Sequence, residues 1–267
     1  ETPDESYNQM LRGIVLDCSA TPTRNKGAVG LHFYGAQGCS IENVKIIATN
    51  AHTGLRGLPS AGAGVVNLEI IGGSYGIDTF NNGAKKTGTA STVIAGLKLS
   101  GQTVRSVRSM GFAPLTIVGF EITPAANVPG FELEAATNPS KSTVCLIDGK
   151  ITVSGSAPVA IDNSSGRNFY ARNVYVTGTD NLVSRVSPAA TLTAIGAWKR
   201  ITEYSYCDLN TGTQYPQPDD TSNGAVPVIS RTLVNGVLAK IEITNGITAN
   251  VLAVKVPNNL ISRHIWA

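Results

Sequence analysis

Apolar positions recur along the first three quarters of the chain in a short phrase rather than in a helical period. The phrase has six or seven residues, with Asn, Gly or Asp followed by alternating apolar and polar positions. Val, Ile and Thr dominate it, and no sustained 3.6-residue period accompanies it, so it predicts β-strands. Its copies read "LRGIVLD", "IENVKII", "VVNLEII", "IAGLKLS", "IVGFEIT", "LIDGKIT" and "ARNVYVT".

The Asn, Gly or Asp of each phrase serves as a marker, and successive markers are about 27 residues apart. They are Gly13, Asn43, Asn67, Gly96, Gly119, Asp148 and Asn173. A second, shorter apolar phrase follows each marker, as in "TGLRGL" and "SYGIDT". A fixed period built from short strands indicates a solenoid, here a right-handed parallel β-helix. An antiparallel sandwich is the alternative, but two-residue hairpin signals between strands of equal length are rare in this sequence.

The pair Gly72-Gly73 separates the strand phrase "VVNLEII" from the shorter phrase "YGID" without room for a hairpin or a helix. Residues without a Cβ allow the backbone to turn sharply with φ > 0, so this pair predicts a corner of the coil. No hairpin is needed in a parallel β-helix, because the hydrogen-bonding partner of each strand lies one coil away.

The coil pattern loosens after Arg185, so we expect residues 1–200 to form the β-helix and residues 201–267 to form a linker with flanking strands. "TLTAIGAWKRITEYSY" fits either a last coil or a flanking strand pair, and "QYPQPDDTSNGAVPV" is typical of a loop or linker. Neither end carries the polar cap that terminal repeats need. We therefore expect coils before residue 1 and a second domain after residue 267.

Charged residues make up only 15% of the chain and the net charge is +3, which argues against nucleic acid or a membrane surface as a partner. No apolar stretch reaches the roughly 18 residues of a membrane span, and no signal peptide is visible. The opening "ETPDESYNQM" is therefore interpreted as a cut end.

The four cysteines form no C-x-x-C pair and are interpreted either as disulfides of a secreted protein or as buried thiols. A sequon at Asn163 and the β-rich composition favour a secreted protein.

Residues 7 to about 200 resemble the pectate-lyase-like β-helix superfamily, and more narrowly the tandem β-helix proteins that include the exo-β-1,3-glucanases of glycoside hydrolase family 55. The segments that carry the resemblance are "YNQMLRGIVLDCS", "GAVGLHFYGAQGCSIENVKI", "GAGVVNLEIIGGSYGI", "PLTIVGFEI" and "LISRHIWA". The resemblance implies the fold and a β-glucan substrate. It also implies a catalytic acid on a second β-helix, which is not present in these 267 residues.

One polar residue follows the buried position of each short phrase and is expected on the outer face, because side chains alternate along a strand. This column reads His32, Arg56, Asp78, Arg108, Glu132 and Asp162, with Arg185 near its end. A groove along this face would offer a sugar chain a series of hydrogen-bonding groups. Alternatively, the opposite charges form cross-strand ion pairs that only stabilise a solvated surface.

Asp78 and Glu132 are the candidate catalytic pair. They lie two coils apart, or about 9.5 Å, near the upper end of the carboxylate separation of inverting glycosidases. A lyase would instead need a base and a cation beside a uronate, for which Arg56 or Arg108 with His32 or His52 would serve.

Two residues near the column, His52 and Tyr75, are also predicted to bind the substrate. They join the column members His32, Arg56, Arg108 and Asp162 in this role. Lys85 and Lys86, and the aromatic residues Tyr34, Phe80, Trp198 and Trp266, are interpreted either as binding groups or as ordinary surface or core residues. Nothing indicates a metal or another cofactor.

We predict a secreted carbohydrate-active β-helix that is part of a glycoside hydrolase acting on β-glucan. The partners are a polysaccharide and another chain or domain of the same protein. A polysaccharide lyase on an acidic glycan and a non-catalytic glycan-binding or structural module are the alternatives.

Overall fold

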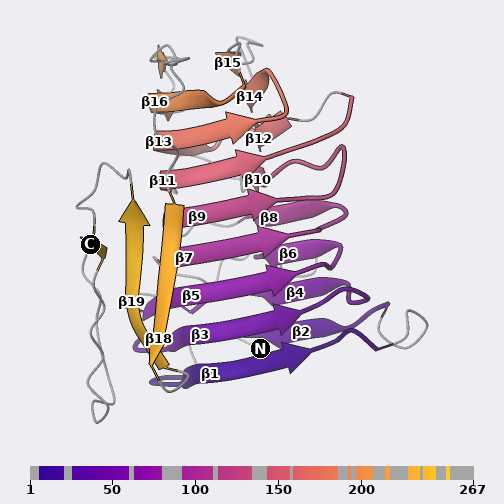
Figure 1. Ribbon diagram of the computed structural model, residues 1–267, viewed down its shortest axis with the longest axis vertical. Coiled ribbons are helices and arrows are strands. Elements are labelled where there is room, and N and C mark those ends of the chain that lie inside the picture. Colours follow the sequence, from indigo (N-terminus) through magenta and orange to yellow (C-terminus); the bar gives the residue numbers. More distant parts are fainter. Residues whose placement is uncertain are drawn as a thin grey trace.

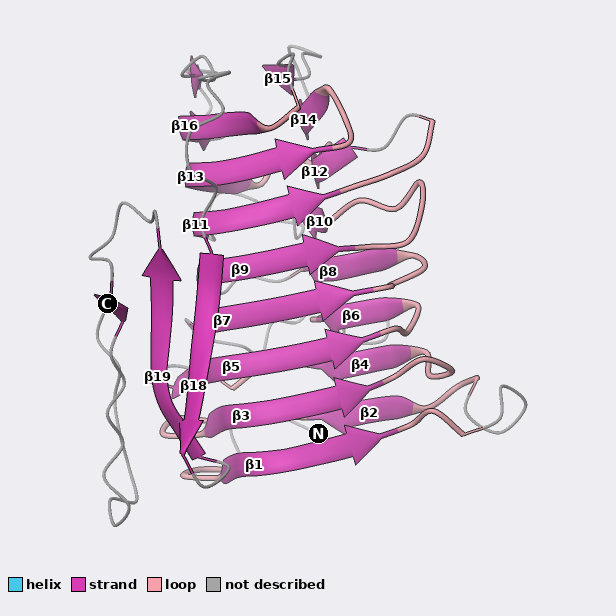
Figure 2. Cartoon of the chain, viewed as in Figure 1, coloured by secondary structure: helices cyan, strands magenta, loops and turns pink. Residues whose placement is uncertain are grey.

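The computed structural model describes residues 6–20, 26–59, 63–79, 92–110, 114–133, 143–156, 159–185, 192–193, 197–206, 214–216, 228–234, 237–244 and 251–252. These residues form strands and loops without a helix (Figure 2). Two sheets of parallel strands stack coil on coil, so the predicted parallel β-helix is confirmed and the sandwich is excluded.

The first sheet, called here the long-strand sheet, contains the marker phrases. Its parallel strands are β1 (Met10–Asp17), β3 (Ser40–Ile47), β5 (Ala63–Ile71), β7 (Thr92–Ser100), β9 (Leu115–Thr123), β11 (Thr143–Thr152) and β13 (Asn168–Thr177). The second sheet, called the short-strand sheet, contains the shorter phrases. Its strands are β2 (Val29–His32), β4 (Thr53–Arg56), β6 (Tyr75–Asp78), β8 (Arg105–Ser109), β10 (Phe131–Leu133), β12 (Val159–Asn163), β14 (Asn181–Arg185) and the antiparallel β15 (Leu192–Thr193).

Every marker residue has a positive φ, between 51° and 73°, in the middle of a long strand. Gly, Asn and Asp tolerate this left-handed conformation better than other residues, which explains why only these three types occupy the position. The marker side chains also bond to one another from coil to coil. Asn67 Nδ2 donates to Asn43 Oδ1 at 2.8 Å, and Asn173 Nδ2 donates to Asp148 Oδ1 at 2.7 Å. The predicted corner is confirmed as well, with φ of 76° and 88° at Gly72 and Gly73.

The core is the thin layer between the two sheets, and Phe120 and Phe131 meet edge-to-face within it at 5.5 Å between ring centroids. Three short strands place a glycine opposite an isoleucine of a long strand: Gly30 opposite Ile46, Gly54 opposite Ile70 and Gly130 opposite Ile151. At Gly54, an added Cβ would lie 2.3 Å from Cγ2 of Ile70. The phrases "TGL" and "PGF" therefore have a steric reason, because the sheets approach too closely there for a side chain.

The parallel order ends at β13, because β16 (Lys199–Tyr206) pairs with it antiparallel and β17 (Gln214–Pro216) continues in the same way. Of the two interpretations of "TLTAIGAWKRITEYSY", the flanking strand is thus confirmed. β16 runs across residue 200, where the sequence predicted the boundary between the β-helix and the linker.

A small antiparallel sheet of β18 (Val228–Val234), β19 (Val237–Thr244) and β20 (Val251–Leu252) follows. β18 and β19 cross the outer face of the long-strand sheet, with β18 against β9 and β19 against β3 (Figure 1). Val66, Ala95 and Val118 are in register on that face and are nevertheless buried. This apolar stripe explains why an additional sheet packs there. Among the described residues, no helix is long and apolar enough to cross a membrane.

Candidate functional site

The predicted polar column exists in the backbone register of the short-strand sheet. Consecutive pairs join His32 to Arg56, Arg56 to Asp78, Asp78 to Arg108, Arg108 to Glu132 and Glu132 to Asp162. Beyond Asp162 the next member is Ser184, since Arg185 pairs with Asn163 instead. The alignment of the column is therefore confirmed from His32 to Asp162, and only its last member differs from the prediction.

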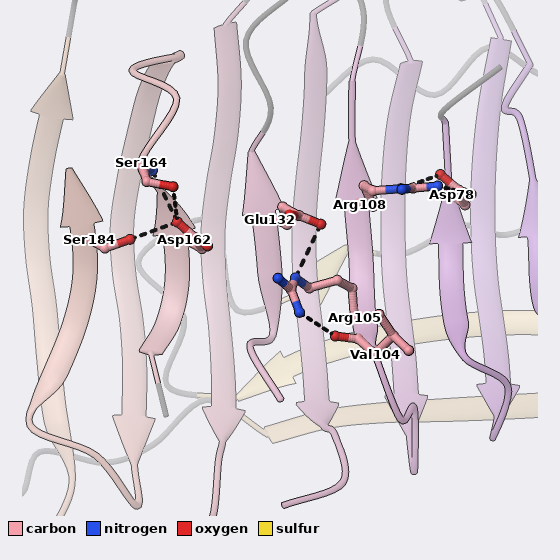
Figure 3. Close-up of polar contacts among 8 residues, drawn as sticks. All are labelled: Asp78, Val104, Arg105, Arg108, Glu132, Asp162, Ser164 and Ser184. Carbon is pink, nitrogen blue, oxygen red and sulfur yellow. Dashed lines mark hydrogen bonds and ion pairs between the residues drawn. The ribbon is translucent and has the colours of Figure 1, made fainter. Parts of the chain in front are cut away.

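Asp78 was expected to be exposed, and this expectation is wrong, because its side chain has no exposed surface. Arg108 covers it with two parallel bonds: Nε donates to Oδ1 at 3.0 Å and Nη2 donates to Oδ2 at 2.7 Å (Figure 3). The Arg108 side chain is itself only 17% exposed. A buried bidentate pair of this kind fixes both side chains and holds Asp78 away from a ligand on the surface.

Tyr75 and His52 extend the cluster toward the preceding coil. The guanidinium carbon of Arg108 lies 4.3 Å from the centroid of the Tyr75 ring, and the His52 ring lies 5.3 Å from the same ring at a tilt of 44°. His52 Nδ1 is 2.8 Å from Oγ1 of Thr53, which orients the imidazole. His52, Tyr75, Arg108 and Asp78 thus form one contiguous group, with the Tyr75 ring held between a cation and an imidazole.

Glu132 is in register with Arg108 but pairs with Arg105, whose Nε lies 3.1 Å from Oε2 (Figure 3). This contact is an ion pair without hydrogen-bond alignment. Arg105 Nη1 also donates to the carbonyl of Val104 at 2.7 Å, which holds the guanidinium at the edge of the strand. The sequence pattern did not indicate Arg105 as a site residue, because strict strand alternation places residues three apart on opposite faces.

Asp162 accepts three bonds from hydroxyl and amide donors (Figure 3). Ser164 donates its Oγ at 2.6 Å and its backbone N at 3.0 Å, and Ser184 donates its Oγ at 2.8 Å. Burial alone would raise the pKa of Asp162, but these bonds and the charge of Arg105 outweigh it, so the pKa is lowered. A carboxylate held in this way stays ionised and is an acceptor rather than a general acid.

Arg56, His32 and Tyr34 form the other end of the column. Tyr34 lies beside His32 in an edge-to-face contact with 4.9 Å between ring centroids. The Nε of Arg56 and the hydroxyl of Tyr34 are buried atoms without a hydrogen-bond partner among the described residues. Burial, followed by the charge of Asp78, raises the pKa of Tyr34, and the charge of Arg56 partly offsets this. Arg56 and Tyr34 are therefore close enough to interact electrostatically.

The other predictions concern residues outside the polar column. Asn163 of the sequon is fully buried, donates to the carbonyl of Arg167 and accepts from the Arg167 amide, so the folded protein does not present it for modification. Cys39 and Cys145 are free thiols, so the disulfide alternative is wrong for these two. Trp198 is half-buried in the turn before β16. Phe80, Lys85, Lys86, Trp266 and Cys207 lie outside the described residues.

Two further features were not foreseen. Arg167 is buried beneath the ends of β8 and β12, where its Nη1 donates to the carbonyl and the hydroxyl of Ser109 at 2.9 Å, and burial lowers its pKa to about 10. An open hollow of about 340 Å³ lies over the turns that lead into the short strands. Its lining is Lys26, Thr49, Asn50, Ala51, Gly73, Ser74 and Thr103, which includes none of the predicted site residues. Among the described residues, no cluster of His, Cys, Asp and Glu could hold a metal ion.

The comparisons with known proteins add no family assignment: no protein-family model matches the chain, and no curated protein matches it.

Proposed function

We propose that this protein binds a polysaccharide along the outer face of the short-strand sheet. The observation that carries the proposal is the register column from His32 to Asp162, in which each coil contributes one polar or charged side chain. Strand pairing repeats these groups at about 4.8 Å, a distance comparable to the length of one sugar unit. A regular series of fixed donors and acceptors suits a ligand that repeats in the same way.

The contacts around the column hold several of its side chains in position before a ligand binds. Arg108, Glu132 and Asp162 are each held by a neighbouring side chain, Asp78, Arg105 and Ser164 respectively, at 2.6 to 3.1 Å. Side chains that are ordered before binding lose little conformational freedom when a ligand arrives. Tyr75 and His52 are partly exposed and add amphipathic surface next to these polar groups.

Hydrolysis is a second candidate, because the register places Asp78 and Glu132 two strands apart, the arrangement predicted for an inverting pair. The contacts weigh against it. Asp78 has no exposed surface and is held by Arg108 through both of its oxygens, so it does not reach a glycosidic bond or an attacking water on the surface. Binding without catalysis is therefore the better-supported form of the proposal, and a secreted location is part of it.

Co-sedimentation with insoluble β-1,3-glucan and affinity electrophoresis in gels containing soluble neutral or uronate polymers test the proposal. His52→Ala removes a group of the proposed face, and we expect its affinity to fall about tenfold, equivalent to about 1.4 kcal/mol. Lys150→Ala, on the long-strand sheet, is the matched control and is expected to bind like the wild type. Retention on no polymer of either class would overturn the proposal. Reducing sugar released from β-glucan by the wild type, and lost in Glu132→Gln, would establish the hydrolase instead.

A further inference from the structure

Arg56 is a cation without a counter-ion within the described part of the chain. Its register neighbours are His32 on one side and Asp78 on the other. Asp78 is the only carboxylate of these neighbours, and Arg108 occupies both of its oxygens from the following coil. The Asp78–Arg108 pair is neutral as a unit, so the charge of Arg56 remains uncompensated at this end of the column.

Two buried hydrogen-bond donors at the Arg56 end of the column indicate a ligand there. The Nε of Arg56 and the hydroxyl of Tyr34 both lack a hydrogen-bond partner among the described residues. Leaving buried donors unsatisfied costs about 1–3 kcal/mol for each group, more for a charged one, so a partner for these two donors would be favourable. Both groups can donate, and a guanidinium cannot accept. The missing partner is therefore an acceptor, and opposite Arg56 it is best an anion.

The backbone holds these donors in position. Gly57, directly after Arg56, has a φ of 80°, and an added Cβ would lie 2.7 Å from two ring atoms of Tyr34. Tyr34 therefore packs against the backbone at a point where only glycine fits. Backbone bonds from Phe33 N to the Arg56 carbonyl at 2.9 Å, and from Gly57 N to the Asp78 carbonyl at 2.9 Å, tie the three coils together at this position.

We propose that Arg56 and Tyr34, with the exposed His32 at the rim, form a subsite for the carboxylate of an acidic sugar. The planar fork of a guanidinium matches a planar carboxylate in two parallel bonds, and a phenol hydroxyl adds a third donor. This inference rests on the proposed function and narrows it: the polysaccharide carries uronate residues, and one of them lies beside Arg56. The opposite end of the column, at Glu132 and Asp162, is acidic and suits sugar hydroxyls instead.

The test compares oligogalacturonate with an uncharged oligosaccharide of equal length, by titration calorimetry at low and at high salt. The wild type is expected to bind the acidic ligand at least tenfold more tightly at low salt, and the preference should shrink as salt screens the charge. Arg56→Gln should abolish the preference, and Arg56→Lys, which keeps the charge without the fork, should restore it in part.

Tyr34→Phe separates a ligand site from a packing role. Removal of a buried hydroxyl without a partner leaves the melting temperature unchanged or raises it, since nothing in the protein loses a bond. Affinity for oligogalacturonate should nevertheless fall several-fold. Lys98→Gln on the long-strand sheet changes the net charge as Arg56→Gln does, and we expect it to bind like the wild type.

The outcomes are distinguishable. Equal binding of neutral and acidic ligands by the wild type, or equal losses in Arg56→Gln and Lys98→Gln, would overturn the carboxylate subsite and leave polysaccharide binding intact. Binding of neither ligand would overturn both the subsite and the proposed function. Unchanged affinity in Tyr34→Phe would remove Tyr34 from the subsite and leave a guanidinium that merely attracts anions, which contradicts the inference as stated.

Discussion

The two faces of this β-helix both carry a column of alternating charges, but the columns differ in what surrounds them. On the long-strand sheet, Lys45, Glu69, Lys98, Glu121 and Lys150 follow one another in register. Glu69 lies 3.3 Å from Lys45 and 3.8 Å from Lys98, and Glu121 lies 3.0 Å from Lys150. The lysine side chains remain 28% to 43% exposed, so water competes for every pair.

The column on the short-strand sheet has the same register but different partners and burial. Asp78 is completely covered and Arg108 nearly so, an aromatic ring lies against the guanidinium, and Glu132 pairs with a residue outside the column. Arg56 has no counter-ion in the described ranges. Register alone therefore does not distinguish a stabilising ladder from a binding face; burial and the identity of the contacting atoms do.

Arg108→Met gives the largest expected difference between the faces. The change leaves the Asp78 carboxylate buried without its cation and removes the contact with Tyr75, so we expect a loss of about 3–5 kcal/mol in the free energy of unfolding. Urea denaturation measures it. The double variant Asp78→Asn/Arg108→Met should recover part of the loss, because no charge is left buried. A loss under 1 kcal/mol in the single variant would show that Asp78 reaches solvent.

Gly54→Ala tests the close approach of the short-strand sheet to the long-strand sheet. Its Cβ would lie 2.3 Å from Cγ2 of Ile70 and 2.9 Å from the Gly76 carbonyl, so overpacking should cost about 1–3 kcal/mol. Gly64→Ala, in β5 of the other sheet, is the control, since its added Cβ would meet nothing nearer than 3.9 Å. Thermal melts of the two variants should therefore differ in sign or size. Equal destabilisation would mean that the core yields at Ile70.

Asp162 gives a smaller effect that depends on pH. Its pKa in the folded protein is below the ordinary value of 3.8, so its contribution is complete at neutral pH and is lost as pH falls through the folded pKa. Because Asp162 is only half-buried, we expect Asp162→Asn to cost no more than about 1 kcal/mol at neutral pH. The gap between the two proteins should close below about pH 4. Urea titrations at several pH values measure the gap, and a gap that widens in acid would contradict the assignment.

Much of the fold could be predicted from the sequence because the constraint recurs in every coil. A left-handed residue in each long strand restricts position 67 and its equivalents to Asn, Gly or Asp, which makes the period visible. The close contact of the sheets restricts position 54 and its equivalents to small residues in most coils. The long-strand charge column follows from the same period, since each of its members stands two residues after a marker.

The contacts of the candidate site were less predictable, because they depend on side-chain direction rather than on register. Arg108 has two carboxylates in register, Asp78 and Glu132, and pairs with only one of them. Glu132 instead pairs with Arg105, which stands three residues before Arg108 on β8. Likewise, strand alternation does not indicate that Asp78 is buried and bonded to Arg108 through both of its oxygens. Strand alternation correctly placed these residues on the outer face but could not say which would stay exposed.

Lys98→Met on the long-strand sheet gives the smallest expected effect. Its ammonium is 3.8 Å from Glu69, its side chain is 43% exposed, and Glu69 retains the closer Lys45 at 3.3 Å when Lys98 is lost. We therefore expect a change in unfolding free energy of about 0.5 kcal/mol or less, and less still at high salt. Urea denaturation in low and in high salt measures it. A loss of 2 kcal/mol or more would mean that the exposed column is as strongly coupled as Asp78 and Arg108, and the contrast between the two faces would then fail.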